Sequence, residues 1–150
     1  MISIHSLAND IMTEDAIGSF PDECCGFFYG AEDAKGNRTV THVLVVNNAK
    51  EGDKRRRFEI SPRDYLRAEQ FADENNLRLL GVYHSHPNHP AIPSETDRLS
   101  AQPYFSYIII SVYNQEVKDI RSWRLNSSFQ FKEEPIHEHQ LTIANPIIQN

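Results

Sequence analysis

The sequence predicts one folded domain in which β-strands and helices are mixed, that is, a protein of the α/β or α+β class. Apolar runs of strand length alternate along the chain with stretches of helical periodicity. The chain has 150 residues, the usual size of one domain, and 39% of them are hydrophobic. A chain of this length buries roughly two-thirds of its unfolded surface, so we expect a core that needs no disulfide staples.

The first half of the chain is predicted to contain two helices. Leu7 and Ile11 form an i,i+4 apolar pair, which favours a helix over 7–20. Ser61-Pro62 supplies the residue types favoured at the N-cap and the first helical position, so we expect a second helix over 61–75. Strands are predicted at 27–29, 40–46 and 58–60, with a turn at 30–37 and a polar loop at 47–57.

The second half is predicted to be mostly strands around one short helix. The apolar run over 79–84 indicates a buried strand, and a short helix is expected over 94–101. Residues 1–150 are expected to form a single domain, of which 126–150 is a C-terminal extension whose structure the pattern does not predict. Further strands are predicted at 107–112, 117–125 and 129–131.

The most informative segment is His84-Ser85-His86-Pro87, followed by Ser94 and Asp97. Side chains at i and i+2 of a strand point to the same face, so both imidazoles converge if the strand continues through His86. Pro87 then ends the strand, because it has no N–H to give to a ladder. Two histidines and one aspartate suit zinc, and catalytic zinc sites keep a fourth position open for water. The segment therefore predicts metal-assisted hydrolysis.

The residues from Ser94 to Asp97 also fit the start of a helix, with Ser94 as N-cap and an acid three residues later. That interpretation needs no metal, but the two can coexist, because Ser94 and Asp97 lie one helical turn apart and share a face. A helix that begins at Ser94 can present both side chains to the histidine pair. The loop over 88–93 must then bring it back over the strand end.

Hydrolysis of an amide also needs a group that moves protons, usually a carboxylate that does not bind the metal. Glu23, in the segment Pro21-Asp22-Glu23-Cys24-Cys25-Gly26, is the best candidate because it directly precedes an apolar strand. It is one of 21 acidic residues, so the alternative is a solvated turn residue.

These residues resemble the JAMM motif of the MPN-domain zinc metallopeptidases. The spacing matches in full: His-Ser-His-Pro, six residues, Ser, two residues and Asp, with Glu23 upstream near a Cys-Gly pair. The resemblance runs from Pro21 through 58–62 and 107–111 to about residue 125. It is closest to the short, single-domain prokaryotic members.

The resemblance implies a zinc ion held by His84, His86 and Asp97 plus a water. It implies Glu23 as general base and acid, and Ser94 as a hydrogen-bond donor to the oxyanion. The implied fold is α/β, a curved mixed β-sheet flanked by helices, which is the MPN/JAB-like architecture and is similar to that of cytidine deaminases. The implied reaction is hydrolysis of an amide or isopeptide bond after the C-terminal Gly of a ubiquitin-like protein, including sulfur carriers with a Gly-Gly tail.

The composition limits the classes of binding partner and the cellular compartment that we expect for this protein. A net charge of −6 argues against generic nucleic-acid binding, which needs a basic footprint. We see no signal peptide and no apolar run of membrane-spanning length, so no membrane partner is expected. Cys24 and Cys25 are adjacent and cannot staple distant segments, which fits a cytoplasmic protein. We expect Cys25 to be a small buried residue rather than a nucleophile.

Two features outside the motif bear on protein partners. Lys54-Arg55-Arg56-Arg57 is the one basic run in an acidic chain. It is either a solvated face or a docking patch for an acidic partner. Ile143, Ile147 and Ile148 in the C-terminal extension leave room for a homo-oligomer.

Two other functions compete with the metallopeptidase. A non-catalytic MPN-type interaction module would use the same fold, but such modules usually lack the metal ligands, and this sequence has all of them. A zinc-dependent nucleobase deaminase needs a His-x-Glu and a Pro-Cys-x-x-Cys, and neither occurs in the sequence. The metallopeptidase is therefore the favoured prediction.

Overall fold

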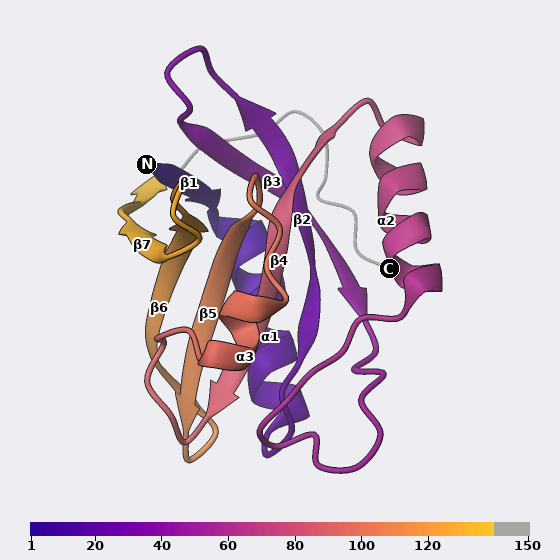
Figure 1. The fold of residues 1–150 in the computed structure, drawn as a ribbon, viewed down its shortest axis with the longest axis vertical. Helices are drawn as coiled ribbons and strands as arrows, with labels where there is room; N and C mark the ends of the chain where they lie inside the picture. The colour runs from indigo at the N-terminus through magenta and orange to yellow at the C-terminus, as the bar shows by residue number, and fades with distance from the viewer. Residues whose placement is uncertain (140–150) are drawn as a thin grey trace.

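The computed structural model describes residues 1–139, which form one mixed sheet of eight strands with three helices (Figure 1). The elements are β1 (Ile2–His5), α1 (Ser6–Ser19), β2 (Cys25–Glu32), β3 (Arg38–Val46), α2 (Pro62–Glu74), β4 (Arg78–Pro87), α3 (Glu95–Leu99), β5 (Ser106–Tyr113), β6 (Glu116–Leu125), β7 (Phe131–Glu134) and β8 (Ile136–His139). The strand order is β7-β6-β5-β4-β2-β3-β1-β8. β4 and β5 are parallel, as are β1 and both of its neighbours, and the other pairs are antiparallel. The predicted α/β class with a mixed sheet is confirmed.

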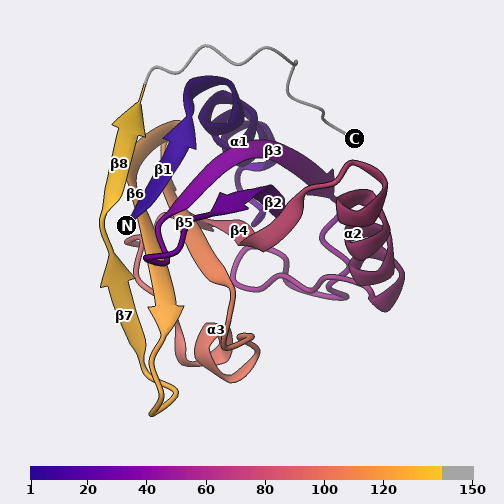
Figure 2. The ribbon, with the colours of Figure 1, turned by 90° about the horizontal axis from the view of Figure 1, so that it is seen from above.

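The sheet curves until its two edges approach each other (Figure 2). β7 pairs with β6 at one edge and β8 pairs with β1 at the other, although only Pro135 separates β7 from β8 in the sequence. The carbonyl of Pro135 accepts a hydrogen bond from the Ile2 N–H at 3.0 Å. A proline suits this junction because it has no N–H to leave unpaired. The described part of the C-terminal extension therefore nearly closes the sheet.

Helix α1 covers one face of the sheet, as predicted, but it buries a different side of the helix from the expected one. Ala8, Met12 and Ala16 are buried, whereas Leu7 is 50% exposed and Ile11 is only partly buried. The small side chains of the two alanines let the helix axis lie close to the sheet. None of the helices in the described range is long and apolar enough to cross a membrane.

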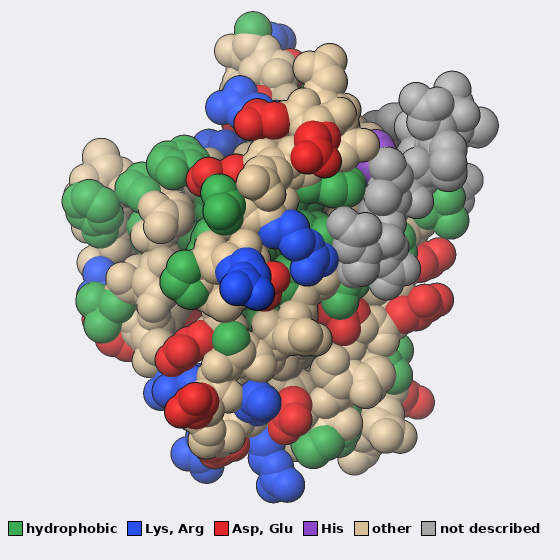
Figure 3. Space-filling model, turned by 90° about the vertical axis from the view of Figure 1, so that its right-hand side faces the viewer, with side chains coloured by type: hydrophobic (Ala, Val, Ile, Leu, Met, Phe, Trp, Pro, Cys, Tyr) green, Lys and Arg blue, Asp and Glu red, His purple; other side chains and the backbone are tan. Residues whose placement is uncertain are grey.

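Helix α2 lies on the opposite side of the sheet. Its predicted cap is confirmed, because the Ser61 hydroxyl accepts a hydrogen bond from the Asp64 N–H at 3.1 Å. Ala68 and Phe71 are buried, and the Tyr29 hydroxyl donates to the Ala68 carbonyl at 3.0 Å. On the face that α2 presents, acidic and basic side chains are interspersed with hydrophobic ones rather than gathered by sign (Figure 3).

Two sequence-based predictions about strands are corrected, and two short strands were missed. Residues 58–60 do not form a strand. The Glu59 carbonyl instead accepts a hydrogen bond from the N–H of Ala49, another loop residue, at 2.8 Å. The last predicted strand, 129–131, begins only at Phe131, because a turn closed by the Asn126 N–H and the Gln130 carbonyl at 2.9 Å precedes it. β1 and β8 were not predicted, since four-residue strands carry little periodicity.

Arg38, at the start of β3, is buried and bonds to residues of β2, β4 and β5. Its Nε donates to Glu32 Oε2 at 2.7 Å, and its Nη1 donates to the Leu80 carbonyl and to Ser106 Oγ, both at 3.0 Å. Its Nη2 donates to the Tyr104 carbonyl at 2.6 Å. A buried guanidinium with this many acceptors is well satisfied, so Arg38 fixes β3 against β4 and β5.

Candidate metal centre and active site

β4 carries His84 and His86 on one face near its carboxyl end. The strand runs through both histidines and ends at Pro87, as predicted. β2 and β5 pair with it on either side, so its backbone is held from both directions. The two imidazole centroids lie 5.0 Å apart, and the residues are 1% and 8% exposed. The fold therefore brings both rings together in a rigid, buried setting.

The segment 88–93 folds back against β5 and β6 and carries the chain to α3. The Ser111 hydroxyl of β5 donates to the His89 carbonyl at 2.6 Å. Trp123 Nε1 of β6 donates to the Ala91 carbonyl at 3.0 Å. These two hydrogen bonds hold the loop, and the expected return of the following helix over the end of β4 is observed.

Ser94 and Asp97 form the capping box of α3, as predicted. Ser94 Oγ accepts from the Asp97 N–H at 3.0 Å, and Asp97 Oδ2 accepts from the Ser94 N–H at 2.9 Å. The same Asp97 Oδ2 lies 3.3 Å from His86 Nε2 and 3.9 Å from His84 Nε2. The capping interpretation is therefore confirmed, and the cap leaves the Asp97 carboxylate beside both histidines.

The charges of this cluster are arranged for a cation. Burial raises the pKa of Asp97, but nearby His84 and hydrogen bonds from His86 and the Ser94 N–H outweigh it and hold the pKa well below its usual range. Burial lowers the pKa of His86, and the hydrogen bonds with Asp97 and the Pro90 carbonyl outweigh it, so the net shift is upward. An ionised Asp97 carboxylate thus faces the His86 imidazole, whose pKa is raised.

The Pro90 carbonyl determines which nitrogen of His86 carries the proton. It lies 2.8 Å from His86 Nδ1, and a carbonyl can only accept, so Nδ1 is the donor. In the neutral ring Nε2 is then unprotonated, and its lone pair faces Asp97 Oδ2 at 3.3 Å. Either a proton on Nε2 or a metal ion between the two atoms satisfies this contact, and a carbonyl that orients a histidine is typical of metal ligands.

His84 gives an independent test of whether a metal fits. Both of its ring nitrogens are buried and have no hydrogen-bond partner among the described residues. Glu23 Oε1 lies 3.5 Å from Nδ1, and the Phe58 ring stacks on the imidazole at 4.4 Å between centroids. Buried polar atoms are rarely left unpaired in native proteins, so the missing partner is informative. A metal ion bound by one nitrogen of His84 would supply the partner of that nitrogen.

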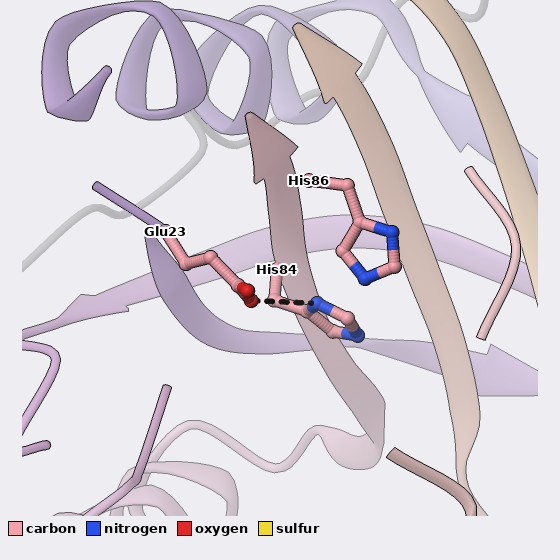
Figure 4. Close-up of side chains that lie close together, drawn as sticks. All are labelled: Glu23, His84 and His86. Atoms are coloured by element: carbon pink, nitrogen blue, oxygen red, sulfur yellow. Dashed lines mark ion pairs between the residues drawn. The ribbon is translucent and has the colours of Figure 1, made fainter. Parts of the chain in front are cut away.

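Glu23 lies beside the histidines, so its interpretation as a solvated turn residue is wrong. It is 5% exposed, and single ligand atoms of Glu23, His84 and His86 all lie within 4.8 Å of one another (Figure 4). Its N–H donates to the Lys54 carbonyl at 2.7 Å, and its carbonyl accepts from Asn48 Nδ2 at 3.1 Å. The carboxylate is thus held in place through its own backbone.

Two cavities of about 390 Å³ each adjoin the cluster, and Arg57 lines both of them. We call the first the aromatic cavity; its lining includes Phe58, Tyr65, Val82, His84, Asp97 and Tyr107. We call the second the arginine cavity; its lining includes Glu23, Arg56, Arg57, His86, His89 and Ser94. A substrate that spans the cluster would therefore place its two halves in chemically different surroundings.

Cys25 is not a nucleophile, as expected. It is fully buried, and burial, together with the negative charges of Asp15, Asp64 and Glu23, raises the pKa of its thiol to about 12. A thiol with that pKa stays protonated at neutral pH, and the thiolate is the reactive form.

The family follows from the sequence match. Residues 6–126 match the family described as prokaryotic homologs of the JAB domain. The chain belongs to this family. Solved structures agree: a protein from Desulfitobacterium hafniense superimposes with a TM-score of 0.82 at 31% identity, covering 94% of each chain. A JAB1/MPN domain protein from Archaeoglobus fulgidus shares the fold, with a TM-score of 0.57 at 15% identity over 93% of this chain and 97% of that one.

Several relatives of this JAB-family chain have functional names, and two of them illustrate the range. A desampylase from Haloferax volcanii is 35% identical over 99 residues, which cover 65% of this chain and 68% of the relative. A CysO-cysteine peptidase from Mycobacterium tuberculosis is 29% identical over 127 residues, which cover 84% of this chain and 83% of the relative.

Sequence reasoning found the polar side chains of this JAB-family site but missed the residues that hold them. Phe58 and Pro90, which contact His84 and His86, carry no local signal. Ser85 could have been found. It alternates with the two histidines and therefore points to the opposite face of β4, where it is buried and its Oγ accepts from the Cys24 N–H at 2.8 Å.

Proposed function

We propose that this chain is a zinc-dependent metallopeptidase that hydrolyses an amide or isopeptide bond after the C-terminal Gly of a ubiquitin-like protein. The observation that carries the proposal is the buried His84, with two unpartnered ring nitrogens, at the meeting point of His86, Asp97 and Glu23. The names of the two relatives, a desampylase and a CysO-cysteine peptidase, support a hydrolase of this kind.

We assign metal binding to His84, His86 and Asp97, and proton transfer to Glu23. The Nε2 atoms of both histidines are the nitrogens nearest Asp97 Oδ2, whereas Glu23 approaches His84 from its Nδ1 side. One metal ion binds only one nitrogen of each imidazole ring. A metal ion bound by both Nε2 atoms would therefore have Asp97, and not Glu23, as its carboxylate ligand. A zinc ion bound there would polarise the scissile carbonyl and lower the pKa of water.

Glu23 and Ser94 supply the remaining chemistry. The Glu23 carboxylate takes a proton from the attacking water and returns one to the leaving nitrogen, the usual work of a positioned carboxylate. The Ser94 hydroxyl accepts from the Asp97 N–H, which leaves its own proton free to donate to the oxyanion that develops on the carbonyl. Both side chains line the arginine cavity, so they reach the same bond.

The substrate we propose is a ubiquitin-like protein of the sulfur-carrier type with a Gly-Gly tail. Glycines carry no side chains, so an extended tail can pass between the two cavities and bring its last carbonyl to the cluster. We treat residues 1–150 as one such catalytic domain. We place its reaction in the cytoplasm, because both cysteines are free thiols.

The test combines metal analysis with intact-mass analysis. The protein is purified, stripped with a chelator and reloaded with zinc, and each form is incubated with ubiquitin-like proteins whose Gly-Gly tails are conjugated to an amine. We expect one zinc per chain in the loaded form. We expect the loaded form to lower the mass of the conjugate by the mass of the leaving group, and the stripped form to cleave nothing. Intact conjugates throughout the panel after incubation with the zinc-loaded protein would reject the proposal.

A further inference from the structure

The side-chain amide of Asn48, just beyond the end of β3, uses its full hydrogen-bonding capacity. Its Nδ2 donates to the Glu23 carbonyl at 3.1 Å and to the Arg57 carbonyl at 3.0 Å. Its Oδ1 accepts from the Lys50 N–H at 3.0 Å and from the Glu59 N–H at 3.1 Å. An amide has two N–H donors and two lone pairs on its oxygen, so both ends of this amide are fully used. Carbonyls only accept and backbone N–H groups only donate, so the partners also determine which way the amide points.

Asn48 closes the segment 48–59 at its base, where it holds Glu59. Midway along the segment, the Lys54 carbonyl accepts from the Glu23 N–H at 2.7 Å. Compact loops of roughly 6 to 16 residues whose ends meet are frequent at functional sites. Glu23 is bonded to this loop through both its N–H and its carbonyl, and Asn48 supplies the second of these bonds. The main chain of Glu23 therefore keeps its position only while the loop keeps its own.

The same amide also holds the part of the loop that carries Phe58. The residues before and after Phe58 are both bonded to Asn48. The Phe58 ring stacks on the His84 imidazole with 4.4 Å between centroids and 25° between planes. Glu23 reaches the same imidazole at 3.5 Å from Nδ1 (Figure 4). One amide therefore ties the carboxylate of the site to the segment that covers His84.

We propose that Asn48 is a positioning residue for the reaction, and that it acts through Glu23 rather than on the substrate. The inference rests on the proposed function, in which Glu23 moves the protons. Asn48 lines neither the aromatic cavity nor the arginine cavity, so it does not contact a substrate held in them. A proton-transfer group must lie within hydrogen-bond reach of its water, and a misplacement of about 1 Å can cost roughly 100-fold in rate. Loss of the two donors of Asn48 would free the Glu23 carbonyl and the loop bonded to it.

The experiment compares wild type with three variants of the full chain, each loaded with zinc and assayed under single-turnover conditions on a ubiquitin-like protein whose Gly-Gly tail is conjugated to an amine. Asn48→Ala removes all four hydrogen bonds of the amide. Asn48→Asp keeps the oxygen that accepts from Lys50 and Glu59 but removes both donors. Asn47→Ala is the matched control, because Asn47 is an exposed neighbouring amide that lines neither cavity. Zinc content and urea unfolding are measured alongside.

We expect the rate to fall by roughly 100-fold in both Asn48 variants at one zinc per chain, and to stay unchanged in Asn47→Ala. Asn48→Asp is the sharper of the two variants, because it keeps the hydrogen bonds that close the base of the loop. A wild-type rate in Asn48→Asp would show that loop closure alone matters. That result, or loss of zinc together with the rate, would overturn the positioning role.

A double-mutant cycle shows whether the effect passes through Glu23. The Glu23→Gln variant has already lost the proton-transfer group, so adding Asn48→Ala to it should cause little further loss of rate. An equal loss in both backgrounds would mean that Asn48 supports the fold in general, and would overturn the inference while leaving the proposed function in place. No cleavage by the zinc-loaded wild type would reject the proposed function and the inference together.

Discussion

The hydroxyl of Ser94 and the carboxylate of Asp97 hold each other in a reciprocal capping box, with hydrogen bonds of 3.0 and 2.9 Å to the two backbone N–H groups. The same Asp97 oxygen lies 3.3 Å from His86 Nε2. Because α3 has only five residues, its cap largely determines where that carboxylate points. Substitutions here must therefore be chosen to separate an effect on the helix from an effect on the site.

Replacing Asp97 with asparagine should remove zinc without removing the cap. The amide oxygen can still accept from the Ser94 N–H, but a neutral amide is not among the ligands that zinc prefers. We expect elemental analysis to show loss of zinc and assays to show loss of activity, in Asp97→Asn and equally in His84→Ala. Thermal unfolding of the metal-free proteins should show Asp97→Asn close to wild type. One zinc per chain in both variants would point to a different ligand set.

The Glu23→Gln variant should bind zinc but lose most of its catalytic activity. The amide is nearly isosteric with the carboxylate but cannot take the proton from water, and positioned acid–base groups typically contribute about 100-fold to 10,000-fold in rate. We expect full zinc stoichiometry with a loss of kcat in that range, measured under single-turnover conditions. Loss of zinc together with activity would show that Glu23 is itself a metal ligand.

Ser94→Ala should slow the reaction and weaken α3 by separate mechanisms. Loss of an oxyanion donor costs roughly 100-fold or more in kcat, and loss of an N-cap costs about 1 kcal/mol. Ser94→Thr is the matched control, since it keeps both a hydroxyl and a capping oxygen. Rate measurements and urea unfolding distinguish the two effects. A Ser94→Ala enzyme as fast as wild type would leave Ser94 with only its capping role.

The ion pair between buried Arg38 and partly buried Glu32 should make stability depend on pH. The hydrogen bond from Arg38 is the main cause that lowers the pKa of Glu32 below its ordinary value of 4.5, against a smaller opposing effect of burial. This contribution is present above the unfolded-state pKa and is lost as pH falls through the folded-state pKa. Arg38→Met should therefore cost about 3 kcal/mol at pH 7. The substitution should cost less in strong acid, because Glu32 is protonated there and the wild type has already lost the ion pair. The remaining cost comes from the hydrogen bonds of Arg38 to Leu80, Ser106 and Tyr104.

Urea unfolding of the metal-free protein at several pH values checks this. Lys118→Met is the control, because Lys118 and its partner Glu116 are both exposed and their removal should change little. A destabilisation by Arg38→Met that stays constant across the pH range would mean that the pair with Glu32 contributes nothing and that only the other hydrogen bonds of Arg38 matter.

The sequence by itself determined the local parts of the site. Strand alternation placed His84 and His86 on one face, and Pro87 marked the end of β4. Helix capping chemistry located the start of α3 at Ser94 and the start of α2 after Ser61. Each of these signals involves residues within one strand or one helical turn, whose geometry depends on few neighbours.

Only the tertiary structure decided what surrounds those residues. Glu23 reaches His84 because β2 pairs with β4 and sets Cys25 opposite His84. The segment from 47 to 61, which forms no helix or strand, brings Phe58 onto His84 and the arginines beside Glu23. The closure of the sheet by β7 and β8 likewise depends on its curvature. Pairing register and loop path arise from contacts between distant segments, and local periodicity carries no information about them.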